Sequence, residues 1–201
     1  MARGLTVDRV VGAAIELADA DGLAAVSMAR VAERLGFTPM SLYRHVSGKD
    51  ELVRRMLDAA LGTPSPFAVD GWRARLEAWA RGLLAVLDRH PWGIDIPITG
   101  MLGTRAQLAW LDRGLEAFAD TALGEDEKAG VVLLLNGYVF WTARLRFQVP
   151  DEGDLPVVPE GFDLTDYPSL ARAVESGIFE DDTTREEDFE FGLESVLDGV
   201  A

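Results

Sequence analysis

The chain has 201 residues, 48% of them hydrophobic, and a formal net charge of −15 at pH 7. This length allows one domain with a substantial core, or a small domain joined to a larger one. No cysteine occurs, which excludes a disulfide framework, a cysteine-based zinc site and a thiol nucleophile. No apolar run approaches the ~20 residues that span a bilayer, and charged residues interrupt the region where a signal peptide would be apolar. We therefore expect a soluble, cytoplasmic protein.

The acidic charge is unevenly distributed along the chain. Residues 1–62 contain eight Lys/Arg and eight Asp/Glu, whereas residues 63–201 contain 11 basic and 26 acidic residues. The N-terminal segment is therefore neutral overall, and the acidic remainder would be repelled by a polyanion. This distribution is compatible with salt-sensitive DNA binding by the N-terminal segment and argues against a protein that coats nucleic acid nonspecifically.

The first 36 residues predict two helices. Apolar residues recur at helical spacing from Val7 to Ala18, and Gly22 ends this first amphipathic pattern. The second helix is predicted to begin at the capping residue Ser27 and to stop at Gly36, where the backbone favours a positive φ.

A very short third helix is predicted from Pro39 to about Val46. Thr38 is a suitable N-cap, and proline is well tolerated at the first helical position. Leu42 and Val46 are expected to point inward, which leaves a compact polar surface of the size that a DNA major groove accepts. Ser47 and Asp50 form a capping-box pattern for a fourth helix, from Lys49 to about Leu61. The sequence therefore predicts a helix-turn-helix.

The segment from Val7 to Leu52 resembles the DNA-binding domain of the TetR (tetracycline-repressor) family of transcriptional regulators. The resemblance rests on the first helix ending in ADADGL, on VSMARVAERLGFTPMSLYRHV and on GKDEL, and it covers the first quarter to third of the chain. The family pattern implies that Ser27, Tyr43, His45 and Lys49 contact backbone phosphates. It implies that Thr38, Met40, Ser41 and Arg44 face the groove.

Beyond residue 62 the sequence predicts helices at 71–89, 104–122, 125–149, 167–176 and 185–200, and no strand. Thr184 and Glu187 form a capping-box pattern before the last helix. The helix at 125–149 is apolar around most of its circumference, which is typical of a helix buried on several sides; a membrane span is the less favoured alternative. We therefore expect an all-α protein, with a helix-turn-helix DNA-binding domain at 1–62 and a helical-bundle domain for effector binding and dimerisation at 63–201.

The ending FEFGLESVLDGV resembles the final dimerisation helix of TetR-type regulators, and helix 125–149 is its expected partner. The candidate dimerisation residues are Val132, Leu135, Val139, Phe189, Leu193, Val196 and Leu197. The alternative is that both helices pack inside one subunit. A homodimer is favoured because helix-turn-helix proteins usually contact two half-sites about 34–36 Å apart.

Apolar and aromatic residues of the C-terminal segment are candidates for an effector site, because ligand pockets in helical bundles are mostly apolar. They are Trp79, Leu83, Trp92, Leu108, Leu111, Phe140, Trp141, Arg144 and Phe147. Residues of this kind are more often core residues than ligand contacts. Arg144 is suited to an anionic effector or to pairing with a neighbouring acid.

The sequence contains no metal-spaced cluster, no glycine-rich phosphate loop after a strand and no nucleophile–histidine–acid arrangement, so we expect no enzyme, metal or cofactor. The resemblance implies a homodimeric repressor that binds palindromic double-stranded operator DNA and is released by an unidentified small-molecule effector. Two alternatives remain open. One is a DNA-binding regulator without such an effector, acting as an activator or controlled by a protein; the other is a helical-bundle enzyme or ligand carrier with a vestigial N-terminal domain.

Overall fold

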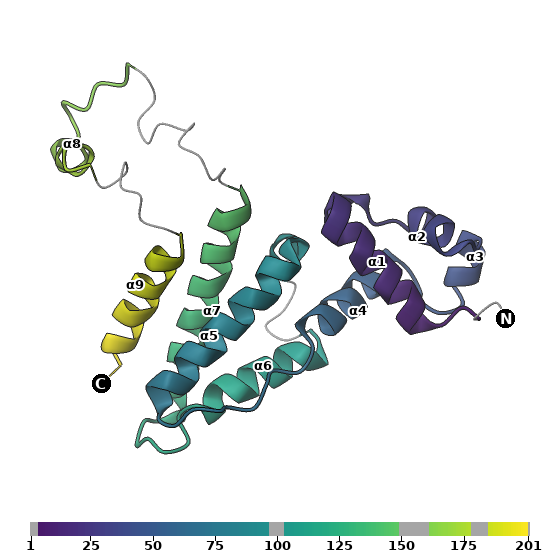
Figure 1. Cartoon of the computed structure of the whole chain (residues 1–201), viewed down its shortest axis with the longest axis horizontal. Helices are drawn as coiled ribbons and strands as arrows, with labels where there is room; N and C mark the ends of the chain where they lie inside the picture. The colour runs from purple at the N-terminus through teal and green to yellow at the C-terminus, as the bar shows by residue number, and fades with distance from the viewer. Residues whose placement is uncertain (1–3, 97–102, 149–160, 178–184, 201) are drawn as a thin grey trace. The chain divides into compact units, whose positions relative to one another are not determined.

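A computed structural model of the chain describes residues 4–96, 103–148, 161–177 and 185–200. All regular secondary structure in these ranges is helical, so the predicted all-α fold class is confirmed (Figure 1). The chain forms two compact units, residues 1–144 and 145–201. The predicted division after residue 62 does not coincide with the boundary between these units, and it stays a prediction.

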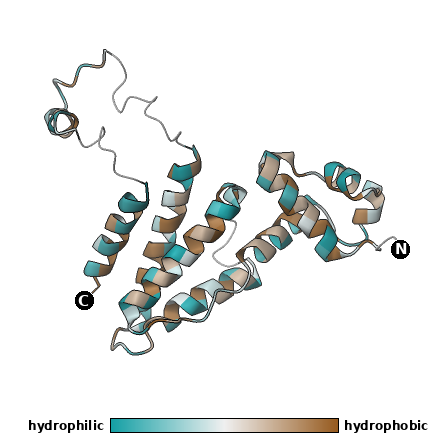
Figure 2. Cartoon of the chain, in the orientation of Figure 1, coloured by the Kyte–Doolittle hydropathy of each residue, from teal (hydrophilic) through white to brown (hydrophobic). Residues whose placement is uncertain are grey.

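The first unit begins with α1 (Val7–Asp21), the 3₁₀ turn η1 (Leu23–Ala25), α2 (Met28–Leu35), the four-residue α3 (Pro39–Leu42) and α4 (Lys49–Leu61). α1 packs against both α2 and α4, and α2 packs against α3. Hydrophobic and hydrophilic residues lie on different sides of these helices (Figure 2). The buried residues that form this N-terminal core are Val10, Val11, Ala13, Ala14, Leu17, Ala18, Val26, Met28, Val31, Ala32, Leu42, Val46, Leu52, Met56 and Trp92.

The same unit continues through α5 (Trp72–Arg89), the 3₁₀ turn η2 (Pro91–Asp95), α6 (Arg105–Glu116) and most of α7 (Glu125–Gln148). α6 packs against α4 and α5, and η2 packs against α1. Figure 1 shows α4 leading from the group of α1, α2 and α3 to α5 and α6. The four helices that carry the N-terminal core are therefore joined to the rest of the unit through α4 and η2.

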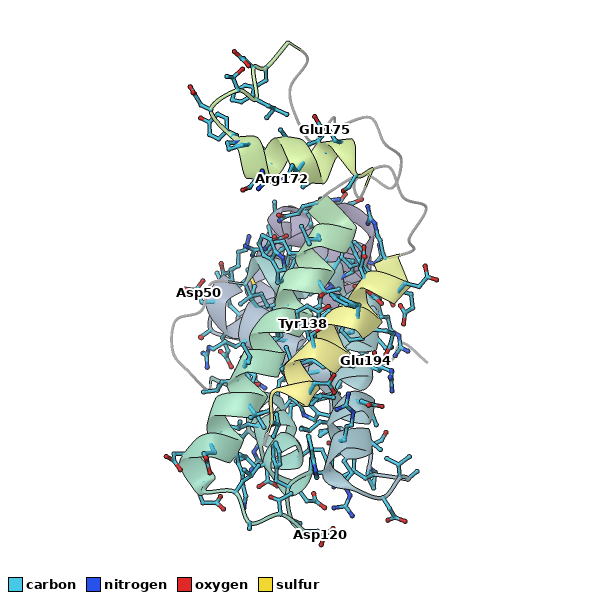
Figure 3. All side chains as sticks on the ribbon, turned by 90° about the vertical axis from the view of Figure 1, so that its left-hand side faces the viewer. Asp50, Asp120, Tyr138, Arg172, Glu175 and Glu194 are labelled. Atoms are coloured by element: carbon cyan, nitrogen blue, oxygen red, sulfur yellow. The ribbon has the colours of Figure 1, made fainter. Side chains whose placement is uncertain are left out.

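The predicted helix at 104–122 is shorter in the structure, where α6 ends at Glu116. Residues 117–121 form tight turns, in which Phe118 N–H donates to the Leu115 carbonyl at 3.1 Å. The Phe118 ring is completely buried and stacks on Trp72, with 6.0 Å between ring centroids. Asp120, labelled in Figure 3, accepts a hydrogen bond from Arg75 of α5 at 2.9 Å. The turn is thus held to α5 by one aromatic and one ionic contact.

The second unit contains the end of α7, α8 (Pro168–Glu175) and α9 (Arg185–Asp198). The Arg146 guanidinium lies 2.7 Å from Glu186 and above the Phe189 ring, at 5.9 Å from its centroid. Arg185 donates to the Arg146 carbonyl at 2.6 Å. These contacts join the end of α7 to the start of α9. The capping role predicted for Thr184 lies outside the described residues.

None of the helices in the described ranges combines the length and the apolar character needed to cross a membrane.

Candidate nucleic-acid interface

The turn between α2 and α3 has the backbone geometry that its sequence predicts. Ser27 is the N-cap of α2, and its hydroxyl accepts the Arg30 N–H at 3.2 Å. Gly36 ends the helix in the left-handed conformation, with φ 74° and ψ 32°, and the next N–H, of Phe37, returns to the Ala32 carbonyl at 2.9 Å. A side chain at Gly36 would be strained in this conformation, so glycine sets the angle at which the chain enters α3.

The third helix is shorter than predicted. α3 ends at Leu42, not near Val46, and the chain continues in tightened turns, in which His45 N–H donates to the Leu42 carbonyl at 2.8 Å. Thr38 is its N-cap and Pro39 its first residue, as predicted. The Leu42 and Val46 side chains are buried in the N-terminal core. A helix of four residues has little stability of its own, so these two side chains hold it in place.

The structure describes all eight predicted DNA-contacting residues, and most of their side chains are accessible. Met40 is 71% exposed and Tyr43 is 49% exposed. Thr38, Arg44 and Lys49 are exposed, whereas Ser27, Ser41 and His45 are partly buried. The hydroxyls of Thr38 and Ser41 are hydrogen-bonded to each other at 3.0 Å. Thr38 therefore caps α3 by its backbone conformation and uses its hydroxyl to join Ser41.

This segment is less acidic than the chain as a whole. The chain contains 34 acidic residues, yet residues 35–49 contain none, and they include Arg44 and Lys49. Neither cation pairs with an acid among the residues that the structure describes, whereas Arg30 lies 2.6 Å from Asp21. Coulomb repulsion of a polyanion is therefore weak at the exposed surface of α3. The absence of acidic residues from positions 35–49 is a further signal of this surface in the sequence.

The turn between α3 and α4 is held by Glu51, and the predicted capping box of Ser47 and Asp50 is wrong. Gly48 is the N-cap of α4, and both the N–H and the hydroxyl of Ser47 donate to Glu51 at 2.6 Å. Arg55 lies 2.7 Å from the other carboxylate oxygen. The Ser47 hydroxyl, then its N–H, then Arg55 stabilise the carboxylate and lower the pKa of Glu51 to about 2. Glu51 reaches Ser47 because it lies one full helical turn after it, whereas Asp50 is one residue too early.

The predicted effector residues fall into different environments. Trp92 belongs to the N-terminal core, and its indole N–H donates to Asp19 of α1 at 2.6 Å. Arg144 donates to the Ile94 carbonyl at 2.9 Å and has no acid partner among the described residues. Of the others, Trp79 and Leu83 are buried, Leu111 and Phe140 are half-buried, and Leu108, Trp141 and Phe147 are exposed. Their common role in effector binding stays a prediction.

Sequence reasoning missed the polar contacts that join α4 to α6. Asp58 of α4 accepts the Ala106 N–H at the start of α6 at 2.7 Å. The Trp110 indole donates to the Leu61 carbonyl at 3.1 Å, and the Trp79 indole donates to the Trp110 carbonyl at 2.8 Å. Buried indole N–H groups usually find a partner, so a tryptophan on an amphipathic helix was an available signal. Which carbonyl it meets depends on tertiary packing.

The predicted dimerisation residues lie on α7 and α9. Val132, Leu135, Val139, Phe189, Leu193 and Leu197 are buried within a single chain, and Val196 is partly buried. Val132 lies directly over Gly114 of α6, where an added Cβ would be 2.8 Å from Val132 Cγ1. Their role in dimerisation stays a prediction. The large apolar residues of α7 that are exposed are different ones: Leu133, Leu134, Trp141, Leu145 and Phe147.

No group of three or more potential metal ligands occurs within the described ranges.

Comparison with known proteins agrees with the geometry of this interface. Residues 10–56 match the family model "Bacterial regulatory proteins, tetR family", and residues 65–201 match "Tetracyclin repressor-like, C-terminal domain". The HTH-type transcriptional repressor DrrR1 of Streptomyces coeruleorubidus is 35% identical over 98% of this chain and 77% of its own length.

Two crystal structures of ActR, a TetR family protein of Streptomyces coelicolor, are also similar. The complex with (S)-DNPA is 27% identical, with a TM-score of 0.80 over 98% of each chain. The complex with actinorhodin is 26% identical, with a TM-score of 0.80 over 98% of this chain and 95% of that one. The family models together cover most of the sequence, and the exposed α3 lies within the first of them. The chain belongs to the TetR family of DNA-binding transcriptional regulators.

Proposed function

We propose that this protein is a cytoplasmic, homodimeric repressor that binds palindromic operator DNA and releases it when a small-molecule effector binds. The observation that carries the proposal is the exposed, acid-free surface of residues 35–49, supported from below by the buried Leu42 and Val46. A short helix held in this way, with accessible Met40, Tyr43 and Arg44, matches the recognition element of a helix-turn-helix.

Base recognition and phosphate binding are assigned to different side chains of this surface. Arg44 is exposed and can make a bidentate contact with guanine that is worth about 1–3 kcal/mol of discrimination. Tyr43, His45, Lys49 and Ser27 are positioned to contact phosphates, which orient the protein on DNA without distinguishing bases.

Replacing Arg44 or Tyr43 with alanine separates these two roles. We expect Arg44→Ala to reduce preference for operator over unrelated DNA by about 10- to 100-fold, because the bidentate contact is lost. We expect Tyr43→Ala to weaken binding to both duplexes by similar factors. Fluorescence anisotropy with the two duplexes at several salt concentrations measures both effects. Loss of specificity with intact nonspecific affinity in Tyr43→Ala would contradict the phosphate assignment.

The second copy in the proposed dimer is expected to cover the exposed side of α7. Leu133 and Leu134 are 47% and 59% exposed, and Trp141 is 58% exposed. Gly130 and Gly137 lie on the same side at helical spacing, and a Cβ at either would have no atom within 4 Å. An apolar helix face of this kind marks an interaction site, and its glycines allow a second helix to approach closely.

We expect Leu134→Glu to convert the dimer to a monomer, because a charge buried without a partner at an apolar interface is unfavourable. Sedimentation equilibrium gives the mass directly. Val69→Glu is the matched control, because Val69 is also exposed but lies in the segment before α5. A dimer that survives Leu134→Glu would place the interface elsewhere, and a monomeric wild-type protein would exclude the homodimer.

Effector control is proposed because ActR, a similar protein, has been crystallised with (S)-DNPA and with actinorhodin. In this chain, the contacts of Asp58 and Trp110 connect the start of α6 to the last turns of α4. An effector that binds better to one arrangement of α6 would displace α4, and with it the recognition surface. Effector and DNA must then weaken each other's binding by the same factor.

The decisive experiment is selection of genomic fragments bound by the purified protein, followed by titration of each complex with actinorhodin and other candidate ligands. Release of a selected fragment, with reciprocal loss of ligand affinity in the presence of DNA, supports the proposal. Binding that no ligand changes favours a regulator without a small-molecule effector. Failure to select any fragment favours a helical-bundle ligand carrier or enzyme.

A further inference from the structure

Within α3 (Pro39–Leu42), one large apolar side chain is exposed, that of Met40. It is 71% exposed, whereas Leu42, two residues later, is completely buried. Methionine is among the residues most often found inside proteins, and the N-terminal core of this unit has already buried Met28 and Met56. Met40 therefore makes no large contribution to the core, and its thioether is available to a ligand of α3.

The polar groups beside Met40 are already paired with each other. The Thr38 and Ser41 hydroxyls share a hydrogen bond at 3.0 Å, and Pro39 has no backbone donor. If either hydroxyl formed a hydrogen bond with a base edge, the hydrogen bond between Thr38 and Ser41 would have to be broken or shared. At this end of α3, the group that can contact DNA without such a cost is the apolar side chain of Met40.

Met40 also has a defined relation to Arg44. The two residues are four apart, and the backbone between them makes one tightened helical turn, in which Tyr43 N–H donates to the Pro39 carbonyl at 3.3 Å and Val46 N–H to the Leu42 carbonyl at 3.0 Å. Side chains four residues apart on a helical turn are neighbours, with about 5–6 Å between their Cβ atoms. This separation corresponds to one or two base-pair steps of about 3.4 Å.

The major groove offers a single apolar group to such a side chain. Adenine, guanine and cytosine present hydrogen-bonding groups there, and only thymine presents a methyl group, at C5. We propose that Met40 is a specificity-determining residue that selects a thymine by contact with its C5 methyl group, one or two base pairs from the guanine contacted by Arg44. The inference rests on the DNA binding described above and adds the identity of a second base.

Replacement of thymine by 2′-deoxyuridine tests this directly, because it removes the methyl group and keeps the base pair. Each thymine of the selected operator is replaced in turn, and the affinity of the intact protein is measured. Burial of one methyl-sized group corresponds to a factor of about 4 in affinity. We expect one thymine in each half-site to be sensitive, with a loss of about 4-fold for one replacement and about 15-fold for both.

Two variants assign that sensitivity to Met40. Met40→Ala, which changes both subunits of the dimer, should weaken binding to the unmodified operator by about 15-fold. It should not distinguish deoxyuridine from thymidine at the sensitive position. Met40→Leu, which keeps an apolar side chain, should retain the distinction. Arg44→Ala should retain it as well, while losing the preference for the adjacent guanine. The salt dependence of Met40→Ala should equal that of the wild type, since no phosphate contact is removed.

The results that would overturn the contact between Met40 and thymine can be told apart from a complete failure of DNA binding. Equal wild-type affinity for every deoxyuridine duplex and the unmodified operator would overturn it, and so would persistent sensitivity at the same position in Met40→Ala. A protein that binds none of these duplexes at low ionic strength would overturn the proposed function and this inference together. Because Met40 is exposed, its variants should unfold at the wild-type denaturant concentration, which separates a DNA effect from a folding effect.

Discussion

Replacing Leu42 with alanine is expected to lower the free energy of unfolding by about 2–5 kcal/mol, because a fully buried leucine leaves a cavity in a packed core. Leu42 is the last residue of the four-residue α3, so its loss also releases the recognition surface. We therefore expect operator affinity to fall more than the stability loss alone would predict. Urea denaturation gives the first quantity, and DNA titration of the folded protein at low temperature gives the second.

Met40→Ala is the matched control for Leu42→Ala. Met40 lies on the same short helix but is exposed, so its replacement should change the free energy of unfolding by no more than about 0.5 kcal/mol. Both variants should lose operator affinity, but only Leu42→Ala should lose stability. Wild-type stability in Leu42→Ala would show that α3 is not held by its buried side chain, and would remove the physical basis for the recognition surface.

Replacing Gly114 with valine is expected to lower the free energy of unfolding by about 3 kcal/mol, through overpacking between α6 and α7. A Cβ at this position would lie 2.8 Å from Val132 Cγ1 and 3.3 Å from Trp79 Cε2. Neither neighbour can move easily, because Val132 is β-branched and the Trp79 indole is bonded to the Trp110 carbonyl at 2.8 Å. The helices would have to separate to accept the larger residue.

Two further variants distinguish crowding at Gly114 from the general cost of placing glycine inside a helix. Gly114→Ala should cost about 1–2 kcal/mol, since overpacking exceeds the gain in helix propensity. Gly12→Ala should instead stabilise by about 0.5–1 kcal/mol, because a Cβ at Gly12 in α1 has no atom within 4 Å. Thermal and urea unfolding of the three variants would reveal this order. Stabilisation by Gly114→Ala would show that α6 and α7 have room between them.

The helix-turn-helix was predictable from sequence because its signals are local. Ser27 and Gly36 bound α2 as expected, and Pro39 begins α3. The helical spacing of apolar residues in these amphipathic helices indicates which side is buried. Leu42 and Val46 lie on that side. Each signal depends on backbone conformation or helical period within a few residues, so no knowledge of distant segments was needed.

Local signals did not predict which side of α7 is buried and which is exposed. This helix is apolar nearly all round, so periodicity contains no information about which residues face the core and which face a partner. The predicted dimerisation residue Val132 lies over Gly114, whereas Leu134 and Trp141 are exposed. Only the packing of α5, α6 and α7 decides between these positions.

The all-α class, the helix-turn-helix and the family could be read from local sequence patterns, because caps, glycine turns and helical periodicity are properties of short segments. Tertiary structure alone decided which polar groups meet across the chain. Trp92 joins the N-terminal core through Asp19, and Trp110 joins α6 to the end of α4. Such contacts link residues 73 and 49 positions apart, and a buried N–H bonds to whichever acceptor the packed helices bring within reach.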